Sequence, residues 1–184
     1  KMAFTAQDVK KLREMTNVGM MDCKKALQAT DGDMDKAVDW LREKGLAKAA
    51  KKADRVAAEG VAYAAVIGGC GVVIEVNSET DFAAKTDAFM DLVKKLAQIV
   101  AEQNPADVEA LKACKYPGTD LTVTEVMQEK VMSIGENMQI RRFARFPENT
   151  SVAYVHAGGT HGVLVNLAVE GDIDVTEIGK NVAM

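Results

Sequence analysis

Apolar residues in the first sixty positions recur with the spacing of α-helices. The first stripe begins at Val9, behind Thr5 and Asp8, whose three-residue separation is typical of a helix N-cap. After a break at residues 16–19, a second short helix is predicted over residues 20–29. The pattern therefore favours two short helices joined by a tight turn.

A third helix is predicted to begin after Asp33, its expected N-cap, and to end at Gly45. Its apolar positions are spaced at i, i+3, i+4 and i+7: Met34, Ala37, Val38 and Leu41. We expect residues 1–46 to form a compact three-helix domain. Residues 47–60 are alanine-rich and basic, and we interpret them as a separate connecting helix that Gly60 ends.

Beyond residue 60 the pattern changes to strands. Residues 61–67 and 72–77 are strand-like, and the glycines between them indicate a β-hairpin. A loop at residues 78–81 leads into a helix that is predicted to run to about Gln103. A short helix with a loop, a longer helix and a strand are then expected at residues 105–118, 122–134 and 138–146.

A second predicted hairpin, residues 152–167, is a near copy of residues 61–76 and aligns with it without a gap. Each hairpin leads into a helix, the second opening near Asp174. We therefore predict an α+β fold whose duplicated antiparallel hairpin-plus-helix core has an N-subdomain at residues 61–148 and a C-subdomain at residues 149–184. Because the last helix has only about two turns, we expect that C-subdomain to be the truncated start of a longer one.

Composition and charge narrow the class of protein. The 184-residue chain is 48% hydrophobic and 27% charged, which is ordinary for a globular protein. A net charge of −4 and a pI of about 5.3 argue against a general nucleic-acid binder. Three widely separated cysteines argue against a disulfide framework or a zinc ribbon. With no signal-peptide-like start and no apolar run of membrane-spanning length, we expect a cytoplasmic protein with no membrane partner.

No constellation of residues predicts an enzyme. His156 and His161 are the only histidines, and Cys70 lies in the turn of the first hairpin. A metal or nucleophile site built from them lacks a third ligand or an orienting carboxylate. The glycine-rich turns match neither a phosphate-binding loop nor a dinucleotide-binding fingerprint. We therefore expect no catalytic residues, no metal and no cofactor.

Two apolar features favour a protein-binding surface. Met20 and Met21 are neighbours on a helix and diverge by about 100°, so at least one should be exposed as an adaptable contact, unless packing at the turn absorbs both. Phe82 follows Asp81 in a loop that opens a helix. The pattern alone is more typical of a staple that folds back on its own helix, whereas a projecting Phe82 would be an anchor for a partner's groove.

Three segments resemble motifs of the elongation factor Ts family. Residues 16–27 (TNVGMMDCKKAL) and 75–85 (EVNSETDFAAK) are similar to its two signatures, and residues 134–138 (IGENM) with Arg141 and Arg142 resemble a third stretch. The motifs occur in the family order, and the resemblance extends over nearly the whole chain. The departures are mild: Asn17-Val18 stand for the usual Gly-Ala, Ser78 for the common Cys and Ala83 for the common Val.

The resemblance implies guanine nucleotide exchange on the GTPase elongation factor Tu during translation elongation, by binding and not by covalent catalysis. It implies a ubiquitin-associated-like N-terminal bundle that docks on the nucleotide-binding domain through Lys10, Leu12, Arg13, Met20 and Met21. It also implies a loop that wedges near the magnesium and phosphate site: Thr80, Asp81, Phe82 and Ala83. Gly135, Glu136, Asn137 and His156 resemble parts that contact another domain of the partner. Loss of magnesium coordination would release GDP and let GTP rebind.

Two other classes stay open. A ubiquitin-associated-like adaptor without any effect on nucleotide accounts for residues 5–45, but it leaves the duplicated core and Phe82 without a role. An RNA-binding module would rest on the basic run from Arg42 to Arg55, which lacks interleaved aromatic residues, so we expect no direct nucleic-acid partner. Many family members continue into a coiled-coil insertion and a C-terminal module that are missing here. The oligomeric state, monomer or homodimer, also stays open.

Overall fold

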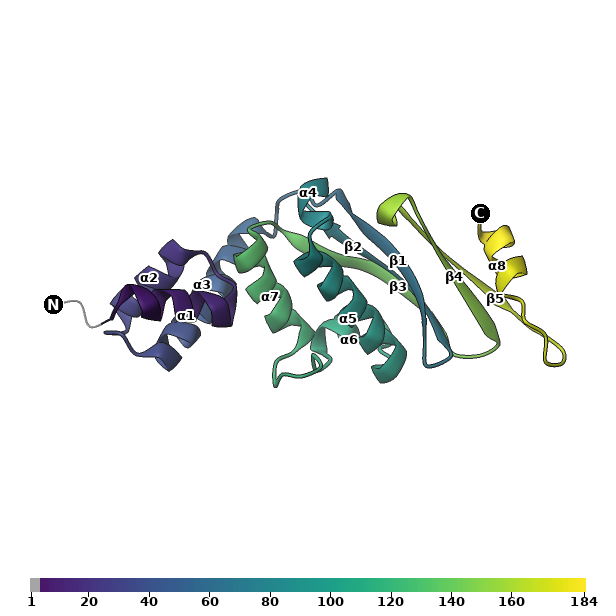
Figure 1. Cartoon of the computed structure of the whole chain (residues 1–184), viewed down its shortest axis with the longest axis horizontal. Helices are drawn as coiled ribbons and strands as arrows, with labels where there is room; N and C mark the ends of the chain where they lie inside the picture. The colour runs from purple at the N-terminus through teal and green to yellow at the C-terminus, as the bar shows by residue number, and fades with distance from the viewer. Residues whose placement is uncertain (1–3) are drawn as a thin grey trace. The chain divides into compact units, whose positions relative to one another are not determined.

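The computed structural model describes residues 4–184 and has an α+β fold, which confirms the predicted fold class. Figure 1 labels its elements along the chain. In order they are α1 (Ala6–Thr16), α2 (Met20–Ala29), α3 (Met34–Lys52), β1 (Glu59–Ile67), β2 (Cys70–Ser78), α4 (Asp81–Ala84), α5 (Asp87–Gln103), α6 (Val108–Ala113), α7 (Val123–Ile134), β3 (Met138–Phe146), β4 (Thr150–His156), the 3₁₀ turn η1 (Ala157–Gly159), β5 (His161–Leu167) and α8 (Thr176–Ala183).

The chain divides into two compact units. The first comprises the N-terminal segment to Asp54 together with Glu125–Asn137, and the second comprises Arg55–Thr124 together with Met138–Met184. The predicted division into domains stays a prediction.

Local capping interactions start and end the helices of the first unit. Thr5 and Asp8 form a capping box, in which the Thr5 N–H donates to Asp8 Oδ2 at 2.7 Å and the Asp8 N–H donates to Thr5 Oγ1 at 3.3 Å. α1 ends where Asn17 adopts a left-handed conformation (φ 54°). Asp33 caps α3 by accepting a hydrogen bond from the Lys36 N–H at 3.0 Å. The predicted N-caps at Thr5 and Asp33 are confirmed.

The core of the first unit combines the three N-terminal helices with one residue of α7. Its buried residues are Val9, Leu12, Val18, Cys23, Ala26, Leu27, Ala37, Leu41 and Met132. The predicted helix end at Gly45 is wrong, because α3 continues to Lys52. A Cβ at Gly45 would lie 3.4 Å from Met132 Sδ, so this glycine leaves room for α7. Residues 47–60 are likewise not a separate helix, since they contain the end of α3 and the start of β1.

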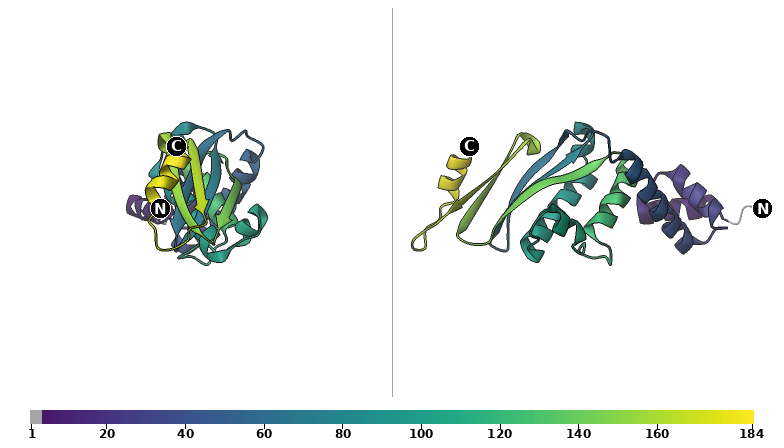
Figure 2. Two further views of the ribbon diagram at one scale, coloured as in Figure 1. Left: turned by 90° about the vertical axis from the view of Figure 1, so that its right-hand side faces the viewer. Right: turned by 180° about the vertical axis from the view of Figure 1, so that it is seen from behind.

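The second unit is layered (Figures 1 and 2). Antiparallel strands form a sheet in the order β1-β2-β3, and a second sheet consists of β4 and β5. α5 packs on one face of the larger sheet, the β4–β5 hairpin packs on its other face, and α8 covers the hairpin from outside. Val72, Ile74 and Val76 alternate along β2 and are buried, as expected for a strand between two layers.

The helix predicted to run from the loop after residue 81 to Gln103 is two helices. α4 is a single turn, and α5 begins at Asp87 after a break at Lys85 and Thr86. Thr86 has an extended backbone (φ −74°, ψ 145°), and its Oγ1 accepts a hydrogen bond from the Phe89 N–H at 3.3 Å. The break follows from this cap, because an N-cap residue lies outside the helical conformation.

The two hairpins share an architecture but not a turn. In the first, Ile67 pairs with Cys70 across two glycines that both have positive φ. In the second, His156 pairs with His161 across residues 157–160, which contain η1. The second turn is thus longer than the first.

The difference in turn length changes the pairing register. The ungapped alignment equates Val76 with Leu167. Val61 pairs with Val76 in the first hairpin, whereas Val152, its counterpart, pairs with Val165 in the second. The duplication therefore holds for the order of the elements and not for the register of their pairs.

Glycines at matching places in both hairpins allow the two sheets to approach. A Cβ at Gly71 would lie 2.3 Å from Ser151 Oγ, and a Cβ at Gly162 would lie 2.9 Å from the Ala62 carbonyl carbon. Both distances are too short for a side chain, so each hairpin carries a glycine against the other. Within residues 4–184, no helix is both long and apolar enough to cross a membrane.

Candidate functional site

Phe82 projects from α4, the helical turn between β2 and α5. Its side chain is 80% exposed, whereas the neighbouring Ala83 and Ala84 are buried. The alanines therefore face the protein and Phe82 faces solvent. The staple interpretation, in which Phe82 folds back on its own helix, is wrong, because a staple would be covered by that helix.

On the side of β2, the hydroxyl groups of Ser78 and Thr80 form hydrogen bonds that hold this turn. Ser78, at the end of β2, is buried and donates its hydroxyl to the Thr80 carbonyl oxygen at 2.9 Å. Thr80 caps α4, because its Oγ1 accepts a hydrogen bond from the Ala83 N–H at 3.2 Å. Asn77 joins the same strand end to β1 by donating to the Glu59 carbonyl oxygen at 3.0 Å.

On the side of α5, Thr86 joins the turn to the start of that helix. Its hydroxyl donates to the Ala83 carbonyl oxygen at 2.7 Å and also caps α5 by accepting from the Phe89 N–H. The Thr86 N–H donates to the same Ala83 carbonyl at 3.1 Å. Phe89 is fully buried, so the turn that carries Phe82 is bonded to the well-packed start of a long helix.

Asp81 places a negative charge beside Phe82. Its carboxylate pairs with Lys85 Nζ at 2.6 Å, and both side chains are exposed. The hydrogen bond from Lys85 holds the pKa of Asp81 below its ordinary value. Asp81 is therefore a carboxylate at neutral pH and lies within reach of a partner.

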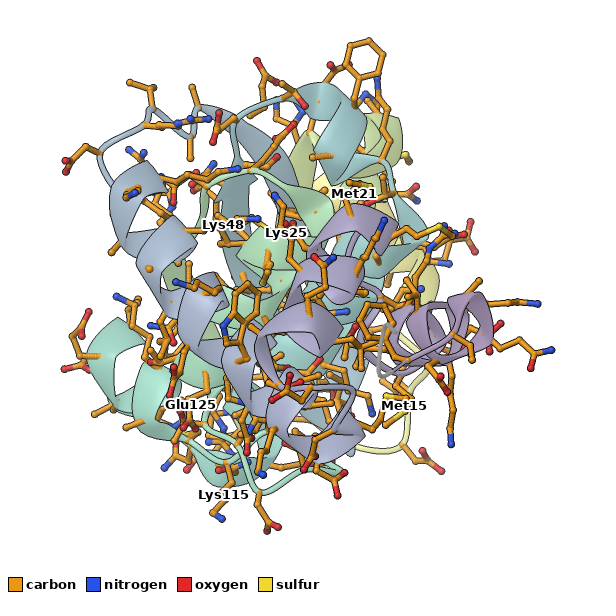
Figure 3. The ribbon with its side chains drawn as sticks, turned by 90° about the vertical axis from the view of Figure 1, so that its left-hand side faces the viewer. Met15, Met21, Lys25, Lys48, Lys115 and Glu125 are labelled. Carbon is orange, nitrogen blue, oxygen red and sulfur yellow. The ribbon has the colours of Figure 1, made fainter. Side chains whose placement is uncertain are left out.

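The corner between α1 and α2 exposes three methionines: Met15, Met20 and Met21. Met20 is 50% exposed and Met21 is 66% exposed. The expectation that at least one of this pair is exposed is confirmed, and both are. Figure 3 shows Met15 and Met21 among the side chains of this unit. We call residues 15–21 the methionine corner.

Charged residues lie close to the methionine corner. Lys25 is one helical turn beyond Met21 on α2 (Figure 3). Asp22 lies between two cations, with Lys25 Nζ at 4.0 Å and Lys48 Nζ, from α3, at 2.7 Å. The surface around the exposed methionines thus carries mixed charge, which favours contact with a protein over contact with nucleic acid.

Of the three α1 residues expected in the partner contact, two are exposed. Lys10 is exposed, with its Nζ 3.8 Å from Glu14, and Arg13 is exposed as well. Leu12 is 0% exposed and packs in the core of the bundle. A side chain with no exposed area offers nothing to a partner, so we assign Leu12 to the core and leave it out of the contact surface.

The turn of Gly135, Glu136 and Asn137 is bonded to the end of α3. Lys52 Nζ donates to the Gly135 carbonyl oxygen, and Asn137 Nδ2 donates to the Ala53 carbonyl oxygen at 3.3 Å. Gly135 has a positive φ of 89° and is exposed, whereas Asn137 is buried. The exposed backbone of the turn is therefore accessible, while the Asn137 amide has an internal role.

His156 lies at the end of β4, opposite His161 on β5. Its Nδ1 is 2.8 Å from the Tyr154 hydroxyl, and the two imidazole centroids are 6.0 Å apart. Both histidines are exposed and Cys70 is buried. Among residues 4–184, no three side chains of the His, Cys, Asp or Glu type come together as a metal site. His156 thus lies exposed at the turn end of the second hairpin.

Sequence reasoning missed two residues of these surfaces. Met15 is exposed although it follows Leu12 by three positions, because α1 ends one residue later. The sequence pattern predicts a continuous helix through Thr86, although a Thr-Asp pair directly before the apolar stripe that begins at Phe89 indicates a helix start there.

Comparison with known proteins gives one consistent result. The family model described as elongation factor TS matches residues 79–184. The chain is 49% identical over 187 residues to elongation factor Ts of Syntrophotalea carbinolica, covering 100% of this chain and 62% of that relative. It is 48% identical over 186 residues to elongation factor Ts of Magnetococcus marinus, covering 100% of this chain and 61% of the relative. It is 49% identical over 193 residues to elongation factor Ts of Trichlorobacter lovleyi, covering 100% and 62%. The chain thus spans about three fifths of the length of these curated relatives.

Proposed function

This chain belongs to the elongation factor Ts family, and on that premise we propose that it binds the GTPase elongation factor Tu and accelerates the release of GDP. GTP then rebinds, which returns the GTPase to translation elongation in the cytoplasm. The chain acts by binding and makes no covalent intermediate. Its substrate is the protein–nucleotide complex, and its product is the nucleotide-free complex.

The observation that carries this proposal is the exposure of Phe82 on a fixed turn. An aromatic side chain that is 80% exposed is poorly placed for the stability of its own chain and well placed to enter a groove of another protein. Its full burial in such a groove contributes about 1.5–3 kcal/mol. We propose that Thr80, Asp81, Phe82 and Ala83 insert near the magnesium and phosphate site of the GTPase, where the shift of neighbouring groups loosens magnesium and the β-phosphate.

One anchor is too small to account for the whole effect of an exchange factor. An acceleration of roughly 10⁴-fold requires the barrier to fall by about 5.5 kcal/mol. The factor obtains this by binding the nucleotide-free GTPase better than the GDP complex, and linkage then requires GDP to weaken factor binding equally. Contacts outside α4 must supply the remainder.

We assign those further contacts to the methionine corner and to two smaller places. Lys10, Arg13, Met20 and Met21 would dock the ubiquitin-associated-like bundle, residues 1–46, on the nucleotide-binding domain. Adaptable methionine side chains suit a partner whose surface changes as it loses nucleotide. Exposed parts of the turn of Gly135, Glu136 and Asn137, together with His156, would contact another domain of the partner.

The experiment is the release of fluorescent GDP from elongation factor Tu in the presence of magnesium. Phe82→Ala is compared with Val56→Ala, a matched control whose side chain is also 80% exposed and lies outside the proposed contacts. We expect wild type and Val56→Ala to accelerate release equally. We expect Phe82→Ala to lose a factor of about ten or more, which corresponds to about 1.4 kcal/mol.

Other outcomes separate the alternatives. Binding to elongation factor Tu without any acceleration by the wild-type chain would favour an adaptor. The absence of binding would rule out the proposed partner for this chain. Equal losses in Phe82→Ala and Val56→Ala would show that the Phe82 turn is not the inserted element.

A further inference from the structure

We propose that Thr86 and Ser78 are positioning residues, which hold α4 in the conformation that presents Phe82 before any partner arrives. The inference rests on the proposed function, because Phe82 is the group that acts on the partner. It concerns two side chains outside the inserted segment, on either side of it.

The first step is that α4 cannot keep its shape by itself. It has four residues, Asp81–Ala84. A helix this short fixes several backbone dihedrals for very few internal hydrogen bonds, so an isolated turn of this length is unstable in water. Its conformation must therefore come from its surroundings, through the packing of Ala83 and Ala84 and through hydrogen bonds.

The second step is that two side-chain hydroxyls bond the backbone carbonyls on both sides of Phe82. Ser78 donates to the Thr80 carbonyl, two residues before Phe82, at 2.9 Å. Thr86 donates to the Ala83 carbonyl, one residue after Phe82, at 2.7 Å. Side-chain hydrogen bonds thus hold the backbone on both sides of Phe82.

The third step is that both hydroxyls belong to rigid parts of the second unit. Ser78 is buried at the end of the central strand β2, where it pairs with Glu59 of β1 and Met138 of β3. Thr86 caps α5 through the Phe89 N–H. A loop fastened to such elements loses little conformational freedom when a partner binds, and preorganisation of this kind raises affinity without a new contact.

The test for Thr86 uses two substitutions that differ in one group. Thr86→Val keeps the shape of the side chain but removes the hydroxyl, and Thr86→Ser keeps the hydroxyl. We expect Thr86→Val to reduce the acceleration of GDP release by about three- to ten-fold, in line with the usual effect of losing a cap. Thr86→Ser should stay within about two-fold of wild type. Ser78→Ala should behave as Thr86→Val does.

A control separates positioning from a general loss of stability. Asp107 caps α6 in the same unit by accepting from the Ala110 N–H at 2.8 Å, and it is remote in sequence from Phe82. Asp107→Ala removes a comparable cap. We expect it to lower the unfolding temperature as Thr86→Val does, while leaving GDP release unchanged. Similar slowing of release by both variants would overturn the positioning role.

A double-mutant cycle tests whether Thr86 acts through Phe82. In the Phe82→Ala background, Thr86→Val should change the release rate by less than about two-fold, because the group that it positions is gone. An undiminished effect in that background would assign Thr86 another role.

Hydrogen exchange of the free protein gives a readout that does not depend on the partner. We expect the amides of residues 79–88 to exchange faster in Thr86→Val and Ser78→Ala than in wild type, and unchanged exchange there would overturn the inference. If the wild-type chain fails to accelerate GDP release, the proposed function fails, while this exchange measurement still decides whether the turn is held by the two hydroxyls.

Discussion

The Phe82 turn and the methionine corner both expose apolar side chains, but the chain builds them in opposite ways. Phe82 stands on a turn whose backbone is bonded on both sides by buried or capping hydroxyls. Met20 and Met21 open α2 behind Gly19, a residue with no side chain that could cap the helix. A fixed aromatic group suits one defined groove, whereas unbranched side chains adapt to several shapes. We infer that the Phe82 turn sets the rate of GDP release and that the methionine corner contributes affinity for elongation factor Tu.

The largest effect that we expect is a loss of stability in the core of the three N-terminal helices, two of which form the methionine corner. Leu12 lies in the core of the bundle with no exposed area. Leu12→Ala should destabilise the first unit by about 2–5 kcal/mol, the range for a buried leucine that leaves a cavity. Urea unfolding measures this, with Leu46→Ala as control because Leu46 is 42% exposed on α3. Equal, small changes in the two variants would return Leu12 to the surface and to the list of contacts.

The next effect distinguishes the two regions directly. Met20→Ser combined with Met21→Ser should raise the concentration of factor needed for half-maximal GDP release by about thirty-fold, since two apolar contacts of roughly 1 kcal/mol each would be lost. The rate at saturation should stay within about two-fold of wild type.

Phe82→Ala should show the opposite signature, a lower rate at saturation. Leu46→Ser is the matched control for the methionine variant, because it replaces an exposed apolar residue of the same unit. A methionine variant that lowers the saturated rate and leaves half-saturation unchanged would contradict the division of roles between the two regions.

The sequence predicts elements well where periodicity and caps agree. α2 begins and ends where the pattern places it, and β3 spans the predicted residues 138–146. The exposure of at least one of Met20 and Met21 also follows from helical geometry. In these places the cause of the structure lies within about ten neighbouring residues, and a single sequence contains it.

The errors arise where packing or turn length, which the spacing of residues does not specify, decides the outcome. Gly45 resembles a helix end, but Met132 of α7 packs against it and the helix continues. Phe82 resembles a staple, but burial of Ala83 and Ala84 turns it outward. The second hairpin resembles the first, but its longer turn shifts the register. None of these causes can be read from local spacing.

The smallest effect that we expect separates two carboxylates, Asp8 of the first unit and Asp81 of the Phe82 turn. Hydrogen bonds from Thr5, chiefly from its backbone N–H, lower the pKa of Asp8 at the start of α1. The pKa of Asp81 in the Phe82 turn is lowered mainly by the hydrogen bond from Lys85. Folding lowers both pKa values, so the stability that each carboxylate contributes is fully present above its unfolded pKa, about 3.9. It is lost as the pH falls through the folded pKa.

Salt should distinguish the two causes. The Asp81–Lys85 pair joins two exposed charges and is screened by ions, whereas the Asp8 carboxylate is held by hydrogen bonds from neutral groups of Thr5. NMR titration at low salt and at roughly 1 M NaCl, where the screening length is about 3 Å, should move the pKa of Asp81 toward its ordinary value and leave that of Asp8 nearly unchanged. Lys85→Met should reproduce the effect of salt on Asp81. If the pKa of Asp81 moved no more than that of Asp8, the charge of Lys85 would contribute nothing distinct and neutral hydrogen bonds would account for both carboxylates.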